Sequence, residues 1–135
     1  MLTRRLFANC ILCAGAGLLA SDPGARAQTP GFTRTVLRRM DFPGDSMATV
    51  QVLVEIEPKT LIARHTHPGV ETAYLLEGGG MLGVAGAADR MVETDGTFQI
   101  PEATPHMLQN GDHRTRVLSI YVVDKNKPLA SPAPL

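Results

Sequence analysis

Three of the four histidines in the chain lie in two short segments and could together hold a metal ion. His65 and His67 are two residues apart, and side chains at that spacing point to the same face of a β-strand. Glu71 follows beyond a Pro-Gly turn, where it can swing back toward the same space. His106 lies much further along the chain, in a proline-rich segment. Three imidazoles and one carboxylate make a nitrogen and oxygen donor set that suits Fe, Mn, Zn, Ni or Cu.

The spacing alone leaves a second interpretation open, in which His65 and His67 are surface residues and His106 is a turn residue. The surrounding sequence bears on this choice. The segment Pro58–Gly78 resembles the first motif of the cupin family, G-x5-H-x-H-x3,4-E-x6-G, and matches it at His65, His67, Glu71 and Gly78. The segment Pro101–Asn110 resembles the second motif, G-x5-P-x-G-x2-H-x3-N, and matches it at Pro101, His106 and Asn110.

Three glycines of these motifs are replaced in this chain, by Lys59, Asp95 and Ala103. Glycines of this kind shape turns and do not bind metal. The replacements therefore bear on the geometry of the loops and leave the four ligand-type positions filled.

The resemblance implies an all-β fold, a single double-stranded β-helix or jelly-roll barrel of the cupin type. It also implies that His65, His67, Glu71 and His106 bind one divalent transition metal ion per chain. Cupins of this size include dioxygenases, isomerases and lyases, so the resemblance implies a metalloenzyme for a small-molecule substrate, with catalytic residues that stay unassigned. The alternative is a non-catalytic periplasmic binder of a small organic acid or sugar, because the fold alone does not choose between them.

Short strands separated by turns must position these side chains. Turn signals recur about every 8–12 residues after Gln28, with no sustained helical period, which is typical of a sandwich or barrel. Ala48–Ile56 alternates apolar and polar residues most clearly, and its apolar row could serve either the core or a subunit interface. We expect about nine strands: Thr33–Phe42, Ala48–Ile56, Leu61–His67, Val70–Leu76, Met81–Val84, Arg90–Thr94, Thr97–Ile100, Pro105–Gln109 and Arg116–Val123.

Strand alternation also predicts what surrounds the site. We expect Ala63 on the face of His65, Ala73 and Leu75 on the face of Glu71, and Leu108 on the face of His106. Further residues could line a pocket or belong to the core: Met81, Met91, Phe98, Met107 and Tyr121. Tyr121 and Gln51 are the polar candidates, although both could be ordinary strand residues. Because aromatic residues are only 4% of the chain and tryptophan is absent, we expect a small aliphatic pocket for a small organic molecule.

The N-terminus has the three parts of a secretory signal peptide. Arg4 and Arg5 give a basic start, an apolar run spans Ile11 to Ala20, and Ala25-Arg26-Ala27 supplies the small residues of a cleavage site. We expect residues 1–27 to be cleaved after Ala27 and the mature protein to be exported to the periplasm. The alternatives are an uncleaved anchor or a buried helix. The apolar run is shorter than the roughly 20 residues that cross a bilayer, so no stable membrane anchor is expected.

The segment Thr3–Phe7 also resembles a twin-arginine signal, which would imply export of an already folded protein. Ordinary Sec signals can carry two arginines by chance, so the route stays open. A protein that folds before export acquires its metal in the cytoplasm, where Cu and Zn are scarce, and this favours Mn or Fe over Zn, Ni or Cu. Both cysteines, Cys10 and Cys13, lie in the segment expected to be removed.

Residues 28–127 are expected to form one barrel domain, and residues 128–135 a proline-rich tail that is either disordered or lies on a partner subunit. The chain carries 13 basic and 13 acidic residues, so a nucleic-acid partner is not expected. A small barrel with an apolar outer face commonly forms a twofold dimer, and we expect a homodimer.

Overall fold

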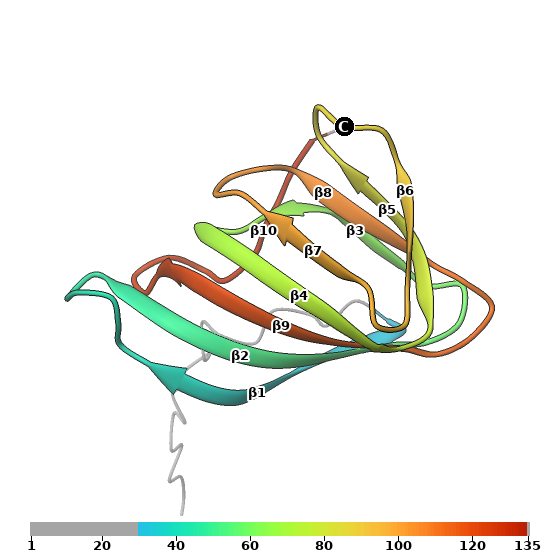
Figure 1. Cartoon of the computed structure of the whole chain (residues 1–135). Helices are drawn as coiled ribbons and strands as arrows, with labels where there is room; N and C mark the ends of the chain where they lie inside the picture. Colours follow the sequence, from blue (N-terminus) through green and yellow to red (C-terminus); the bar gives the residue numbers. More distant parts are fainter. Residues whose placement is uncertain (1–29, 135) are drawn as a thin grey trace, which may run out of the picture.

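The computed structural model describes residues 30–134, in which ten strands form two antiparallel five-stranded sheets that face each other (Figure 1). One sheet has the order β1-β2-β9-β4-β7 and the other the order β10-β3-β8-β5-β6. The strands are β1 (Phe32–Met40), β2 (Met47–Ile56), β3 (Leu61–Thr66), β4 (Gly69–Glu77), β5 (Gly79–Val84), β6 (Arg90–Glu93), β7 (Thr97–Ile100), β8 (His106–Asn110), β9 (Thr115–Asp124) and β10 (Ser131–Pro132).

The prediction of an all-β domain is confirmed, since the part of the chain that the structure describes contains strands and turns only. Among residues 30–134 no helix has the length and apolarity that a membrane crossing needs. The expected signal peptide, residues 1–27, lies outside the described residues.

The hydrophobic core lies between the two sheets and is built mainly from the alternating strands β2 and β9. In β2 every second residue from Ala48 to Ile56 is buried, so this row belongs to the core and not to a subunit interface. In β9 the buried residues are Thr115, Val117, Ser119, Tyr121 and Val123. Because β2 and β9 pair in a regular register over their whole length, their buried side chains form one continuous face of the core.

The strand β3 departs from simple alternation, and this makes one sequence prediction wrong. Ile62 pairs with Leu108 and His65 pairs with His106, so β3 advances three residues while β8 advances two. Such a bulge changes which side chains share a face. Ile62 is therefore buried beside the site, whereas Ala63, which we expected there, is exposed. The predicted inward positions of Ala73, Leu75 and Leu108 are confirmed.

The C-terminal segment packs on its own barrel, which corrects the prediction of a disordered or partner-bound tail. Ser131 and Pro132 form β10 and pair with Thr66 and His65 of β3. Leu129 packs against the hydrophobic core. The chain therefore returns to β3 after leaving β9.

Three loop residues adopt the left-handed conformation at the positions where the two motifs have glycine. Lys59, Asp95 and Ala103 have φ angles of 60°, 66° and 55°. Glycine takes this conformation without strain, whereas a Cβ atom makes it unfavourable. A backbone hydrogen bond holds each of these residues: the Lys59 amide donates to the Gly111 carbonyl, the Asp95 amide to the Leu75 carbonyl and the Ala103 amide to the His67 carbonyl. The loop geometry is kept although the glycines are absent.

We expect Ala103→Gly to stabilise the protein by about 0.5–1 kcal/mol, because relief of the left-handed strain exceeds the added chain entropy of glycine. Chemical denaturation with urea measures the change. The matched control is Ala88→Gly, because Ala88 is also exposed in a loop but does not have a positive φ, so this change should be destabilising. A loss of stability in Ala103→Gly equal to that in Ala88→Gly would contradict the assignment of strain.

Candidate metal centre

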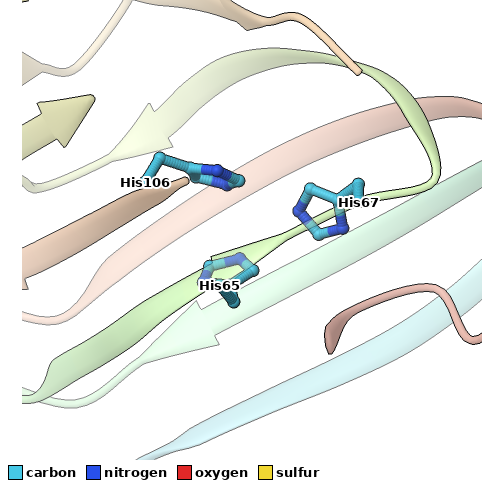
Figure 2. Close-up of side chains that lie close together, drawn as sticks. All are labelled: His65, His67 and His106. Atoms are coloured by element: carbon cyan, nitrogen blue, oxygen red, sulfur yellow. The ribbon is translucent and has the colours of Figure 1, made fainter. Parts of the chain in front are cut away.

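Three imidazole rings converge between the two sheets (Figure 2). His65 lies on β3 and His106 on the neighbouring strand β8, where the two residues are direct register partners. His67 follows immediately after the end of β3. The ring centroids of the three pairs are 4.3 to 5.0 Å apart, and one ligand nitrogen from each residue lies within 4.8 Å of the others. This arrangement could hold a metal ion.

Glu71 brings a carboxylate to the same point from the opposite sheet. It lies on β4 and is buried. Its Oε2 atom is 3.2 Å from Nε2 of His67 and 3.3 Å from Nε2 of His106. The structure thus brings together all four residues that the sequence singles out.

Each imidazole is oriented by a backbone carbonyl that accepts a hydrogen bond from Nδ1. The acceptors are Ala63 for His65 at 2.7 Å, Leu129 for His67 at 2.6 Å and Thr104 for His106 at 2.9 Å. A carbonyl oxygen can only accept, so Nδ1 carries the proton in each ring. In the neutral ring the lone pair is then on Nε2, the form in which an imidazole binds metal.

Two hydroxyl groups of β9 fix the other carboxylate oxygen of Glu71. Ser119 Oγ donates to Oε1 over 2.8 Å, and Tyr121 Oη donates to the same atom over 3.0 Å. From the sequence alone Tyr121 is an ambiguous candidate, and nothing in the pattern singles out Ser119. Gln51, the other polar candidate, is on the outer face of β2, because its neighbours Val50 and Val52 face the core.

Burial and neighbouring charges set the protonation of these groups. Burial is the main reason that the pKa of His65 is lowered to about 4, and the charge of His106 adds to the effect. Burial on its own would raise the pKa of Glu71, but the contacts with His106, His67 and Ser119 outweigh it, so the pKa is lowered. Burial and the charge of Glu71 raise the pKa of Tyr121. At neutral pH the site therefore holds a neutral His65, a carboxylate and a neutral phenol.

The donor set fits a cation. Nε2 of His67 is buried and has no hydrogen-bond partner among residues 30–134, although it faces Glu71. A buried nitrogen lone pair directed at a carboxylate is unfavourable unless a positive charge lies between them. A metal ion with nitrogen and oxygen ligands satisfies this requirement.

A pocket opens beside the four residues, with an empty volume of about 400 Å³ that includes solvent at its mouth. His65, Glu71 and His106 contribute to its wall. Three of the residues predicted as possible lining are in the wall: Phe98, Met107 and Tyr121. Met81 and Met91 are not, because they pair with each other on β5 and β6 and are exposed. The remaining lining residues are Arg34, Val54, Ile56, Ile62, Leu108, Val117 and Ser119.

A family model described as a cupin domain matches residues 52–121, from β2 to β9. No curated protein sequence matches the chain. Several solved structures are similar to it. The DMSP lyase DddQ from Ruegeria pomeroyi DSS-3 is 19% identical with a TM-score of 0.66, and the match covers 76% of this chain and 52% of that one. The chain thus spans about half the length of that structure.

An uncharacterized conserved protein with a double-stranded beta-helix domain from Klebsiella pneumoniae subsp. pneumoniae MGH 78578 is 18% identical, with a TM-score of 0.64 and coverage of 82% of this chain and 90% of that one. KdgF from Halomonas sp. is 16% identical, with a TM-score of 0.61 and coverage of 75% and 88%. At these identities the likeness concerns the fold, and it confirms the prediction of a double-stranded β-helix barrel.

We expect deletion of residues 128–135 to weaken metal binding about 10–100-fold, because His67 loses the Leu129 carbonyl that orients its ring. Competition with a chelator, using zinc as the probe, measures the affinity. Leu129→Ala is the matched control, since it removes the side chain that packs on the core but keeps the carbonyl. Equal zinc affinity in the truncated and full-length proteins would contradict the role of this hydrogen bond.

Proposed function

The chain belongs to the cupin domain family, and we propose that it is a metalloprotein whose centre acts on a small organic molecule and that it is exported. The observation that carries the proposal is the set of three imidazoles, each with Nδ1 bonded to a backbone carbonyl and Nε2 free for a ligand bond. His65, His67, His106 and Glu71 would hold one divalent transition metal ion. Such an ion polarises a bound oxygen or activates dioxygen.

The residues around the centre hold its ligands in place. Ser119 and Tyr121 donate hydrogen bonds to one oxygen of Glu71 and orient it, which leaves Oε2 directed at the imidazoles. Hydrogen bonds of this kind fix the orientation of a ligating carboxylate and raise the affinity of the site for its metal ion. The donor set suits several metals, and loading in the cytoplasm before export would favour Mn or Fe over Zn, Ni or Cu.

The reaction class that we propose is that of a dioxygenase, isomerase or lyase. A DMSP lyase is among the proteins with a similar fold, which supports this class at the level of fold only. Apart from the site residues, the pocket wall is mainly apolar, which fits a small substrate with an apolar part.

One observation favours a second candidate, a non-catalytic binder of a small organic acid or sugar. Glu71 is the single carboxylate among the described residues that line the pocket, and its oxygens already contact two hydroxyls and two imidazoles. The neighbouring phenol of Tyr121 stays neutral because its pKa is raised. Neither group is free to act as a general base, so binding without turnover would need no further residue.

We expect purified protein to contain about one equivalent of transition metal per chain, and the double variant His65→Ala, His106→Ala to contain almost none. Inductively coupled plasma mass spectrometry measures the content. His113→Ala is the matched control, because the side chain of His113 is exposed and remote from the three converging rings. Equal and negligible metal in the parent protein and the double variant would end the proposal.

The same proteins decide between enzyme and binder. Oxygen uptake and product formation are followed over a panel of diketones, phenols and uronates. Turnover that disappears in the double variant identifies an enzyme, whereas saturable binding with unchanged compounds identifies a binder.

We also propose that the mature protein begins at Gln28, is periplasmic and forms a homodimer. The basic start, apolar run and Ala-x-Ala end support export. The edge strand β1 and the turn after it expose apolar side chains, which supports a second copy as the partner: Val36, Leu37, Met40 and Phe42.

Native mass spectrometry of the protein recovered from a periplasmic extract tests both points separately. The mass of the denatured chain should correspond to residues 28–135, and the native complex should contain two chains. A full-length chain in the cytoplasmic fraction would contradict export, and a monomer at micromolar concentration would contradict the dimer.

A further inference from the structure

Arg34 places a positive charge on the wall of the pocket that contains His65, Glu71 and His106. Its Nε atom is buried and has no hydrogen-bond partner among the described residues. No carboxylate of residues 30–134 lies within ion-pair distance of its guanidinium group. A half-buried guanidinium group whose Nε–H lacks an acceptor gains from an anion bound beside it.

The position of Arg34 on β1 directs its side chain to the inside of the barrel. Arg34 is the register partner of Val54 on β2, and side chains of direct partners lie on the same face of a sheet. Val54 is buried and lines the same pocket. The guanidinium carbon lies 4.7 Å from the centre of the Phe32 ring, which restrains it by a cation–π contact. Arg34 is thus held at the pocket and is not a freely moving surface residue.

The rest of the pocket wall, away from the four site residues and the hydroxyls that hold Glu71, is apolar. It consists of Val54, Ile56, Ile62, Phe98, Met107, Leu108 and Val117. Arg34 is the one permanently charged cation among the described lining residues. A ligand complementary to this pocket therefore has an anionic group at one end, which pairs with Arg34, and an apolar body, which contacts the apolar side chains.

We propose that Arg34 binds the carboxylate of the ligand, and that the ligand class of this protein is a small organic acid with an apolar body, whose other end reaches His65, Glu71 and His106. The inference rests on the proposed function and names its substrate class. The planar guanidinium group can donate two parallel hydrogen bonds to a carboxylate, which gives both affinity and orientation. A neutral sugar fits less well, because it would leave Arg34 unpaired and place hydroxyl groups against aliphatic side chains.

The experiment compares acids with uncharged analogues of the same shape. Short-chain monocarboxylates and their primary amides are titrated into zinc-loaded protein, and affinities are measured by ligand-observed nuclear magnetic resonance. The variants are Arg34→Gln, which removes the charge, and Arg34→Lys, which keeps the charge but cannot donate two parallel hydrogen bonds to one carboxylate. Arg38→Gln is the matched control, because Arg38 lies on the same strand but is exposed and donates to its neighbouring Leu37 carbonyl.

We expect the parent protein and Arg38→Gln to prefer at least one acid over its amide by about tenfold or more. Arg34→Gln should lose this preference and Arg34→Lys should keep part of it. Zinc content, measured on the same samples, should be unchanged in all variants. The inference is overturned if no acid of the panel binds better than its amide, or if the preference survives in Arg34→Gln. Absence of zinc from the parent protein would instead overturn the proposed metal centre, so the two failures are distinguishable.

Discussion

The orientation of three imidazole rings by backbone carbonyls is the constraint on which the site depends. The acceptors belong to β3 itself, to the loop before β8 and to the segment after β9. Each hydrogen bond leaves Nε2 as the lone-pair nitrogen and directs it inward. The two sheets must close for these rings to meet Glu71, which comes from the opposite sheet with its own supports on β9. The geometry of the metal site therefore depends both on the packing of the two sheets and on the backbone carbonyls that orient the histidines.

Much of the site could be predicted because its residues are close in sequence or belong to compact motifs. The pair His65 and His67 follows from strand geometry, and the regular strands β2 and β4 bury the residues that alternation selects. The bulge in β3 could not be predicted, because it depends on pairing with β8 and not on local composition. Ser119 was missed for a related reason: its role requires the register of β9 against β4, where it faces Ala73 next to the pair Glu71 and Tyr121.

The loops show how tertiary contacts override local preference. Lys59 and Ala103 keep a left-handed backbone because hydrogen bonds to Gly111 and His67 hold them there. Gly78, which the chain retains, also has a positive φ, and a side chain there would clash with Arg114 and Thr115. The retained glycine is thus required by space as well as by backbone conformation, whereas the replaced positions require the conformation alone. This difference explains which substitutions the barrel tolerates.

The hydrogen bond from His67 to the Leu129 carbonyl has a consequence for the order of events during biosynthesis. Ribosomes make the chain from the N-terminus, so β3 and its histidines exist before β9 and the segment that contains Leu129. A nascent chain that ends before this segment carries His67 without the acceptor that fixes its tautomer. Orientation of all three imidazoles is therefore coupled to completion of the barrel, and the native ligand geometry exists only once the last segment of the chain is in place.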